Sequence, residues 1–120
     1  MADLTSQTAV NQFQQLRNRQ NDLYRKNTAA LIAAAKAADM DSVNLLRAER
    51  ATLLEADKAI LDSELRFAEC TLDQSEAEKR LIAQVQSANA MVRRIETLSD
   101  VLDSAAQMAI VVKRLIVLLT

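Results

Sequence analysis

The stretch VNLLRAERATLLEADKAILDSELRF, residues 43–67, decides the fold of this 120-residue chain. Large apolar residues recur in it mostly at every seventh position, and further leucines lie beside them. The recurring residues are Val43, Leu46, Leu53, Ile60 and Phe67, and the adjacent leucines are Leu45, Leu54 and Leu61. A seven-residue apolar repeat is typical of a helix that packs along one side in a coiled-coil-like manner. We therefore predict a long amphipathic helix here, with other helices packed along it.

The segments on either side carry a similar periodicity. Towards the N-terminus the stripe comprises Phe13, Leu16, Gln20, Leu23, Asn27, Ala30, Ala34 and Ala37. Towards the C-terminus it comprises Leu81, Ala88, Met91, Ile95, Leu98, Leu102, Ala105, Ala109, Val112, Ile116 and Leu119. In the first stripe Gln20 and Asn27 are amides, and a polar residue in a coiled-coil seam trades stability for register. We predict that these two residues set the register of the first helix.

Two clusters of capping residues divide the chain. Asp39, Asp41 and Ser42 can each accept a backbone N–H group at the start of a helix. In CTLDQSEAEK, residues 70–79, three overlapping pairs have the spacing of a capping box or its Asp variant. The expected helices therefore span about 4–38, 42–70 and 73–119.

Composition favours an all-α fold. The chain has no Gly and no Pro, and aromatic residues make up only 2% of it. Tight turns commonly contain Gly or Pro, and strands are enriched in aromatic residues. Three long helices with short connections pack as an elongated antiparallel bundle, so we predict a single domain spanning residues 1–120. The alternative is a short fourth helix from about residue 105, because Ser104 and Gln107 also have capping-box spacing.

Charge supports the pairing of the first two helices. Residues 1–38 contain five basic and two acidic residues, a net charge of +3, whereas residues 39–71 contain four basic and eight acidic residues, a net charge of −4. Opposite charges on the flanks of a helical hairpin favour its formation, although each exposed pair contributes only about 0–1 kcal/mol. The whole chain has a formal net charge of −1, so we expect no nucleic-acid partner.

The composition also excludes most catalytic and cofactor chemistry. The chain has no His, so the common general base and the Ser-His and Cys-His nucleophile pairs are missing. One Cys without His cannot form a closed zinc site, and phosphate-binding loops require Gly. We interpret Cys70 as a small apolar residue near a helix end. We predict that the protein is not an enzyme and binds no metal or cofactor.

The terminal run MAIVVKRLIVLLT, residues 108–120, is the most apolar part of the chain. It is shorter than the roughly 20 residues that cross a bilayer, and Lys113 and Arg114 lie at its centre, so a membrane anchor is disfavoured. As a helix, the run is apolar on nearly all sides, which is more than one chain of three helices can cover. We expect another copy or another protein to contact the excess apolar residues, which are Ile110, Val111, Leu115, Val117 and Leu118.

The favoured function is that of a non-enzymatic structural or interaction protein, which assembles with itself or binds a partner helix through its apolar seams and C-terminal helix. Residues 34–57, AAKAADMDSVNLLRAERATLLEAD, have a helix, an acidic turn and a Leu/Arg/Glu-rich helix, a pattern similar to that of flagellar and type III export chaperones. An export-chaperone-like adaptor is therefore one alternative, and a membrane-active protein that uses residues 105–120 is another. The single Cys and the lack of a signal peptide favour the cytoplasm, with secretion by a signal-peptide-independent route left open.

Overall fold

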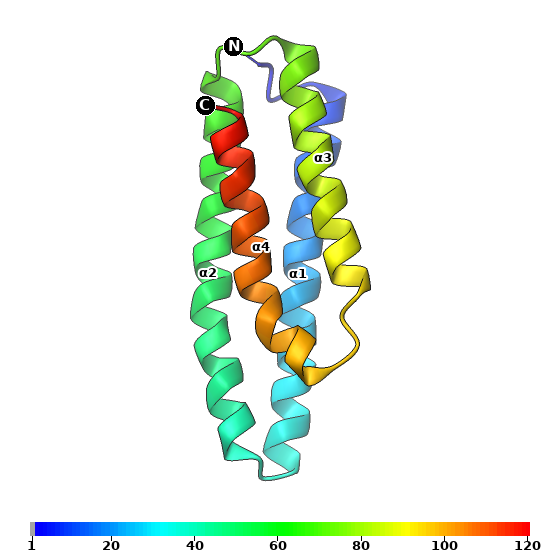
Figure 1. Ribbon diagram of the computed structural model, residues 1–120, viewed down its shortest axis with the longest axis vertical. Helices are drawn as coiled ribbons and strands as arrows, with labels where there is room; N and C mark the ends of the chain where they lie inside the picture. The colour runs from blue at the N-terminus through cyan, green and yellow to red at the C-terminus, as the bar shows by residue number, and fades with distance from the viewer. Residues whose placement is uncertain (1) are drawn as a thin grey trace.

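The computed structural model describes residues 2–120, and within them the chain forms four α-helices and no strand. The helices are α1 (Gln7–Lys36), α2 (Met40–Glu69), α3 (Gln74–Arg93) and α4 (Leu98–Leu118). They form an elongated bundle measuring 53 × 21 × 18 Å (Figure 1). The predicted all-α bundle is confirmed, and its elongation follows from α1 and α2, since 30 residues make a helix of about 45 Å.

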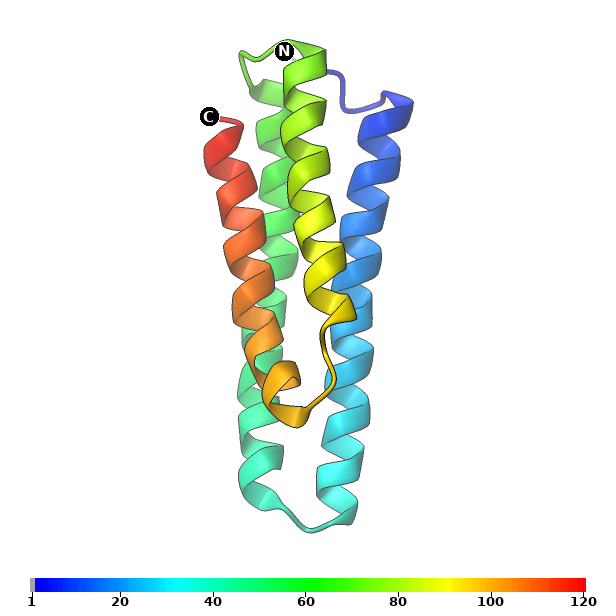
Figure 2. The same cartoon turned by 45° about the vertical axis from the view of Figure 1, so that its right-hand side comes forward.

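Two hairpins, α1–α2 and α3–α4, pack side by side in the bundle (Figures 1 and 2). Around the bundle the order is α1, α2, α4, α3, so that α2 lies between α1 and α4. Consecutive helices are antiparallel, whereas the adjacent pairs α2/α4 and α1/α3 are parallel. The closed ends of α1 and α2 extend beyond the shorter hairpin, as both views show.

Helices α2 and α3 begin at capping residues. The side chain of Asp39 accepts hydrogen bonds from the backbone N–H and the hydroxyl of Ser42, at 3.2 and 2.6 Å. At the start of α3 the Asp73 side chain accepts from the backbone N–H of Glu76 at 2.9 Å. These are two of the predicted capping positions. In the turn before α2, Ala38 adopts φ 57°, a left-handed conformation that glycine would adopt at lower cost.

The predicted third helix is interrupted at residues 94–97, and this differs from the sequence-based expectation of one helix over residues 73–119. Thr97 Oγ1 accepts from the backbone N–H of Asp100 at 3.2 Å, and Asp100 Oδ2 accepts from that of Thr97 at 3.1 Å. This reciprocal capping box starts α4 at Leu98 rather than near residue 105. Ser104 lies inside α4 and is buried, with its hydroxyl donating to the Val101 carbonyl at 2.7 Å, so it caps no helix.

The core consists of two apolar clusters. The larger one runs along most of the bundle and includes an edge-to-face contact between Phe13 and Phe67, whose ring centroids are 5.6 Å apart. The smaller one lies towards the closed end of the α1–α2 hairpin and comprises Ala34, Val43, Leu46 and Val101. Burial along one side of every helix accounts for the stability of a bundle whose exposed ion pairs contribute little.

Candidate interaction surfaces

The apolar residues of α4 that we expected to contact a partner fall into two groups. Val111 and Leu115 are buried in the chain's own core, so in this structure they are not available to a partner. Ile110 and Val117 are 55% and 72% exposed, and Leu118 is half-buried. The reason is that α4 packs against α2, α3 and α1, and these helices cover more of the terminal apolar run than an arrangement of three helices would.

What remains exposed on α4 is a narrow face that is both apolar and cationic. Ile110 and Val117 are seven residues apart, and the exposed Lys113 and Arg114 lie between them. The spacing of three, four and seven places all four side chains on one side of the helix. We call these four residues the α4 outer face. Residues 106–120 contain these two cations and no acidic residue.

A longer apolar surface lies on α2 and is formed by leucines beside the main repeat. Leu54, Leu61 and Leu65 are 56%, 58% and 52% exposed. We call them the α2 leucine line. With Ala51, Lys58 and Ala68 they follow a second heptad register, spaced alternately by three and four residues on the outside of the helix. The sequence contains this signal as an outer repeat that accompanies the regular inner repeat of α2.

Carboxylates flank the leucine line along its outer side. Glu55, Asp62 and Glu69 are exposed and occur at intervals of seven residues, in step with the leucines. Asp62 is 3.9 Å from Arg66, whereas Glu55 and Glu69 form no ion pair within residues 2–120. Residues 54–69 contain five acidic and two basic residues, a net charge of −3. An apolar line beside regularly spaced carboxylates, two of which form no ion pair within residues 2–120, is suited to a helix that carries both apolar and cationic residues.

Carboxylates on the inner side of the line are held by α1. Asp57 accepts a hydrogen bond from the Tyr24 hydroxyl at 3.0 Å, and Glu64 pairs with Arg17. Burial, together with the hydrogen bond to Asp57, raises the pKa of Tyr24 to about 12. These contacts fix the leucine line at the edge of α2 that adjoins α1, where Leu61 lines a groove of about 300 Å³ between the two helices.

The two predicted seam amides are buried and link α1 to α2. Gln20 Nε2 donates to the Leu53 carbonyl at 2.8 Å, and Asn27 Nδ2 donates to the Leu46 carbonyl at 3.0 Å. Both carbonyls belong to α2, so a slip of one helix along the other would leave these amides without their partners. The contacts support the register-setting role as a proposal, since a buried amide without a partner costs about 1–3 kcal/mol.

Asn27 is also part of a buried polar layer between the two apolar clusters. Its Oδ1 accepts from Arg50 Nε at 2.8 Å, and its Nδ2 donates to Glu49 Oε1 at 3.0 Å. Glu49 is buried, and its Oε2 has no hydrogen-bond partner among the described residues. Burial raises the pKa of Glu49, the Asn27 hydrogen bond lowers it in opposition, and the carboxylate of Asp103 on α4 raises it further. Ionised Glu49 is therefore a source of local instability.

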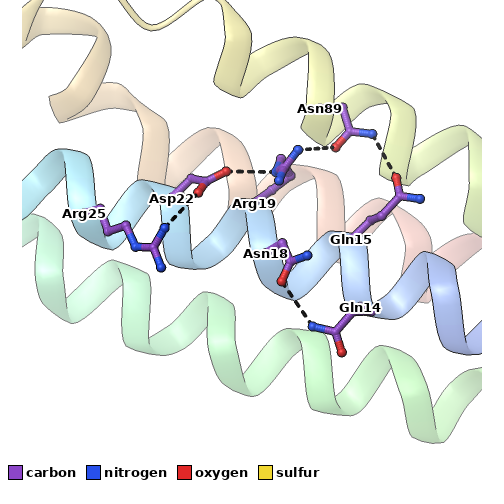
Figure 3. A network of polar contacts seen from close by, with 7 residues as sticks. All are labelled: Gln14, Gln15, Asn18, Arg19, Asp22, Arg25 and Asn89. Atoms are coloured by element: carbon purple, nitrogen blue, oxygen red, sulfur yellow. Dashed lines mark hydrogen bonds and ion pairs between the residues drawn. The ribbon is translucent and has the colours of Figure 1, made fainter.

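The part of α1 that adjoins α3 is polar, in contrast to the exposed side of α2 (Figure 3). Asn89 of α3 donates to Gln15 Oε1 at 3.3 Å and accepts from Arg19 Nη1 at 3.5 Å. Arg19 in turn forms an ion pair with Asp22 at 3.0 Å, and Arg25 lies 4.0 Å from the same carboxylate. These groups bond mainly to one another and join α1 to α3. The network has the character of a hydrated rim rather than of a binding surface.

A second concave region lies at the closed end of the α1–α2 hairpin, beyond the end of α3. It has a volume of about 380 Å³ and is lined by an alanine face of α1 and by the residues that begin α4. The alanines are Ala29, Ala30, Ala33, Ala34 and Ala37. Ile95 and Val101 form the opposite wall. This groove exists because the capping box at Thr97 turns the chain back before α3 reaches the end of α1.

Three further features bear on function. Residues 2–120 contain no group of three or more His, Cys, Asp or Glu side chains placed to hold a metal ion. Over the same residues, no helix combines the length and the apolar character needed to cross a bilayer. Cys70 is buried, as expected for a small apolar residue at the end of α2.

Comparison with protein-family models, with curated proteins and with solved structures returned no match to this chain. The surfaces of the bundle therefore provide the basis for its proposed function.

Proposed function

We propose that the protein is a non-enzymatic interaction protein whose helical bundle binds a further helix on the outside of α2. The observation that carries this proposal is the α2 leucine line, with carboxylates at matching intervals along its outer side. Exposed apolar residues in a heptad register are typical of a surface that packs against another helix. A partner helix would place apolar side chains on Leu54 and Leu61 and its cations near Glu55 and Glu69.

Two alternatives to this function are an export-chaperone-like adaptor and a membrane-active protein. In the adaptor, the docked helix belongs to a client protein. Membrane contact has less support, because much of the apolar run of residues 108–120 is buried against the chain's own helices. We place the function in the cytoplasm, where a lone thiol such as Cys70 stays reduced.

The proposal can be tested with two synthetic helical peptides. Both have leucines in heptad spacing, and they differ only in that one has Lys and the other Glu at the flanking positions. We expect the Lys peptide to shift the backbone amide NMR signals of residues 51–69 with weak affinity, since a single helix face buries less area than a stable interface does. The Glu peptide should not bind at the same concentrations, because its charges repel those of α2.

A matched pair of variants tests the location of binding. Leu61→Glu should abolish the shifts, whereas Ile32→Glu, which changes an equally exposed apolar residue of α1, should leave them unchanged. The proposal is wrong if neither peptide binds, if both bind equally, or if Leu61→Glu binds the Lys peptide as the unmodified protein does.

A further inference from the structure

We infer that the helix bound by the α2 leucine line is α4 of a second copy of this chain, docked through its outer face. This inference rests on the proposed function and identifies its partner. The α2 surface requires apolar residues seven positions apart with cations beside them. The α4 outer face provides them, since Ile110 and Val117 are seven residues apart and Lys113 and Arg114 lie between them.

The spacing of the two surfaces matches. Leu54 and Leu61 are separated along α2 by seven residues, or about 10 Å, and so are Ile110 and Val117 along α4. When the two helices pack lengthwise, both apolar pairs can be in contact at once. Val117 is the most exposed of the large apolar residues described and has the most surface to bury.

Charge distinguishes this pairing from a symmetric one. If two α2 helices met through their leucine lines, the unpaired carboxylates of Glu55 and Glu69 would face an identical acidic surface. Like charges opposed across an interface disfavour it. The segment 54–69 has a net charge of −3 even though Lys58 lies on the leucine line itself, whereas residues 106–120 contribute two cations and no acidic side chain. The α4 outer face is therefore the better match in this chain for the acidic α2 surface.

The position of the two surfaces determines the kind of assembly. The leucine line lies at the edge of α2 next to α1, whereas α4 packs against a different side of α2. One copy can thus bind a second copy through α2 and a third through α4. When a contact between two different surfaces is not reciprocated by the same two copies, it is heterologous and continues into a ring or an open chain rather than ending at a dimer.

The test uses two charge-reversed variants of the full chain, studied by sedimentation velocity. The first, Glu55→Lys with Glu69→Lys, alters the α2 surface. The second, Lys113→Glu with Arg114→Glu, alters the α4 outer face. We expect the unmodified protein to form species larger than a dimer as its concentration rises, and to do so less at high salt because charge contributes to the contact. Each variant should sediment as a monomer on its own and should melt cooperatively by circular dichroism.

Combining the substitutions separates a heterologous contact from other modes. A chain that carries all four substitutions should associate again, because both charges are reversed together. Mixed with each other, the two separate variants should also associate, because the basic α2 surface of the first is complementary to the acidic α4 outer face of the second. Their unaltered surfaces are complementary as well, so the mixture should grow beyond a dimer, whereas a symmetric contact between two α2 helices would give only a heterodimer that grows no further.

A control and a second readout keep the outcomes distinct. Arg93→Glu with Arg94→Glu reverses an adjacent exposed pair of cations at the end of α3 and should assemble like the unmodified protein. The inference is overturned if the unmodified chain stays monomeric at millimolar concentration, or if either charge-reversed variant assembles as well as it does. Binding of the Lys peptide by such a monomer would leave the proposed function intact, whereas loss of both would contradict both.

Discussion

The helices α2 and α4 show opposite relations between apolar content and exposure. α4 contains the most apolar stretch of the chain, yet most of it is buried, including Val111 and Leu115. α2 alternates apolar and charged residues regularly, yet exposes Leu54, Leu61 and Leu65 by more than half. The difference shows that exposure depends on where a residue lies relative to the neighbouring helices. α4 contacts α1, α2 and α3, whereas α2 has no neighbour along its outer edge.

The largest effect on stability is expected at the buried Leu115 of α4, and the exposed Val117 nearby is its control. Leu115→Ala should lower the free energy of unfolding by about 2–5 kcal/mol, because it leaves a cavity in a fully buried site. Val117→Ala should change it by less than about 0.5 kcal/mol. Urea denaturation measures both. Similar losses for the two variants would mean that the burial pattern of α4 is not the one described.

A substitution in the buried polar layer tests whether hydrogen bonds hold α1 and α2 in register. Asn27→Ala removes the partner of the Leu46 carbonyl, Glu49 and Arg50 at once. We expect a loss of about 1–3 kcal/mol, because buried polar groups then lack partners. Asn18→Ala, at an exposed position of the same helix, is the control. A loss no greater than that of the control in chemical denaturation would rule out the register-setting role.

The start of α4 determines where its apolar run is placed. Thr97→Ala removes the hydroxyl that caps Asp100 and should destabilise the protein by about 1 kcal/mol. Thr97→Ser, which keeps the hydroxyl, should behave nearly as the unmodified protein does. Thermal melts of the two variants provide the measurement. Equal melting temperatures would indicate that the capping box does not define the end of the α3–α4 connection.

Substitution of Glu49 should have the opposite effect and raise the free energy of unfolding, by up to about 1 kcal/mol. Its pKa is raised in the folded state, so ionisation opposes folding, and stability falls as the pH rises from about 4 through the folded-state pKa. Glu49→Gln keeps an acceptor for Asn27 without the charge. The variant should therefore be more stable than the unmodified protein at pH 7, and the difference should shrink towards pH 4. A difference that stays constant with pH would contradict this account.

The smallest effect on stability is expected on the outside of α2. Leu54→Gln should change the free energy of unfolding by less than about 0.5 kcal/mol, since the side chain is already exposed. Its neighbour Leu53 is fully buried, so Leu53→Gln should unfold at a far lower urea concentration. The contrast between adjacent leucines checks the register of α2 directly. If Leu54→Gln were the more disruptive, the helix would have to be rotated about its axis.

Periodicity and capping residues predicted the all-α fold, both amides of the α1 seam and the turn at Asp39. They did not predict the interruption before α4, because Ile95, Leu98 and Leu102 keep the apolar spacing across it. The signal that was missed is the pair Thr97 and Asp100, an Asp variant of the capping box. Local patterns locate apolar stripes, but they do not show how many neighbouring helices will cover each one.

The same limit explains the candidate surfaces. Apolar content pointed to α4, and the structure leaves Ile110 and Val117 exposed while burying Val111 and Leu115. The α2 leucine line was visible in the sequence as a second heptad register. Only the arrangement of α1 and α4 around α2 shows that it faces outwards.

The most direct test of the central claim is methyl NMR of the full chain over a range of concentrations. We predict that the methyl signals of Leu54, Leu61 and Leu65 shift together with those of Ile110 and Val117 as the concentration rises, with the same apparent affinity. The signal of buried Leu115 should stay in place. Shifts confined to one of the two surfaces, or no shift at either, would contradict the docking of α4 on α2.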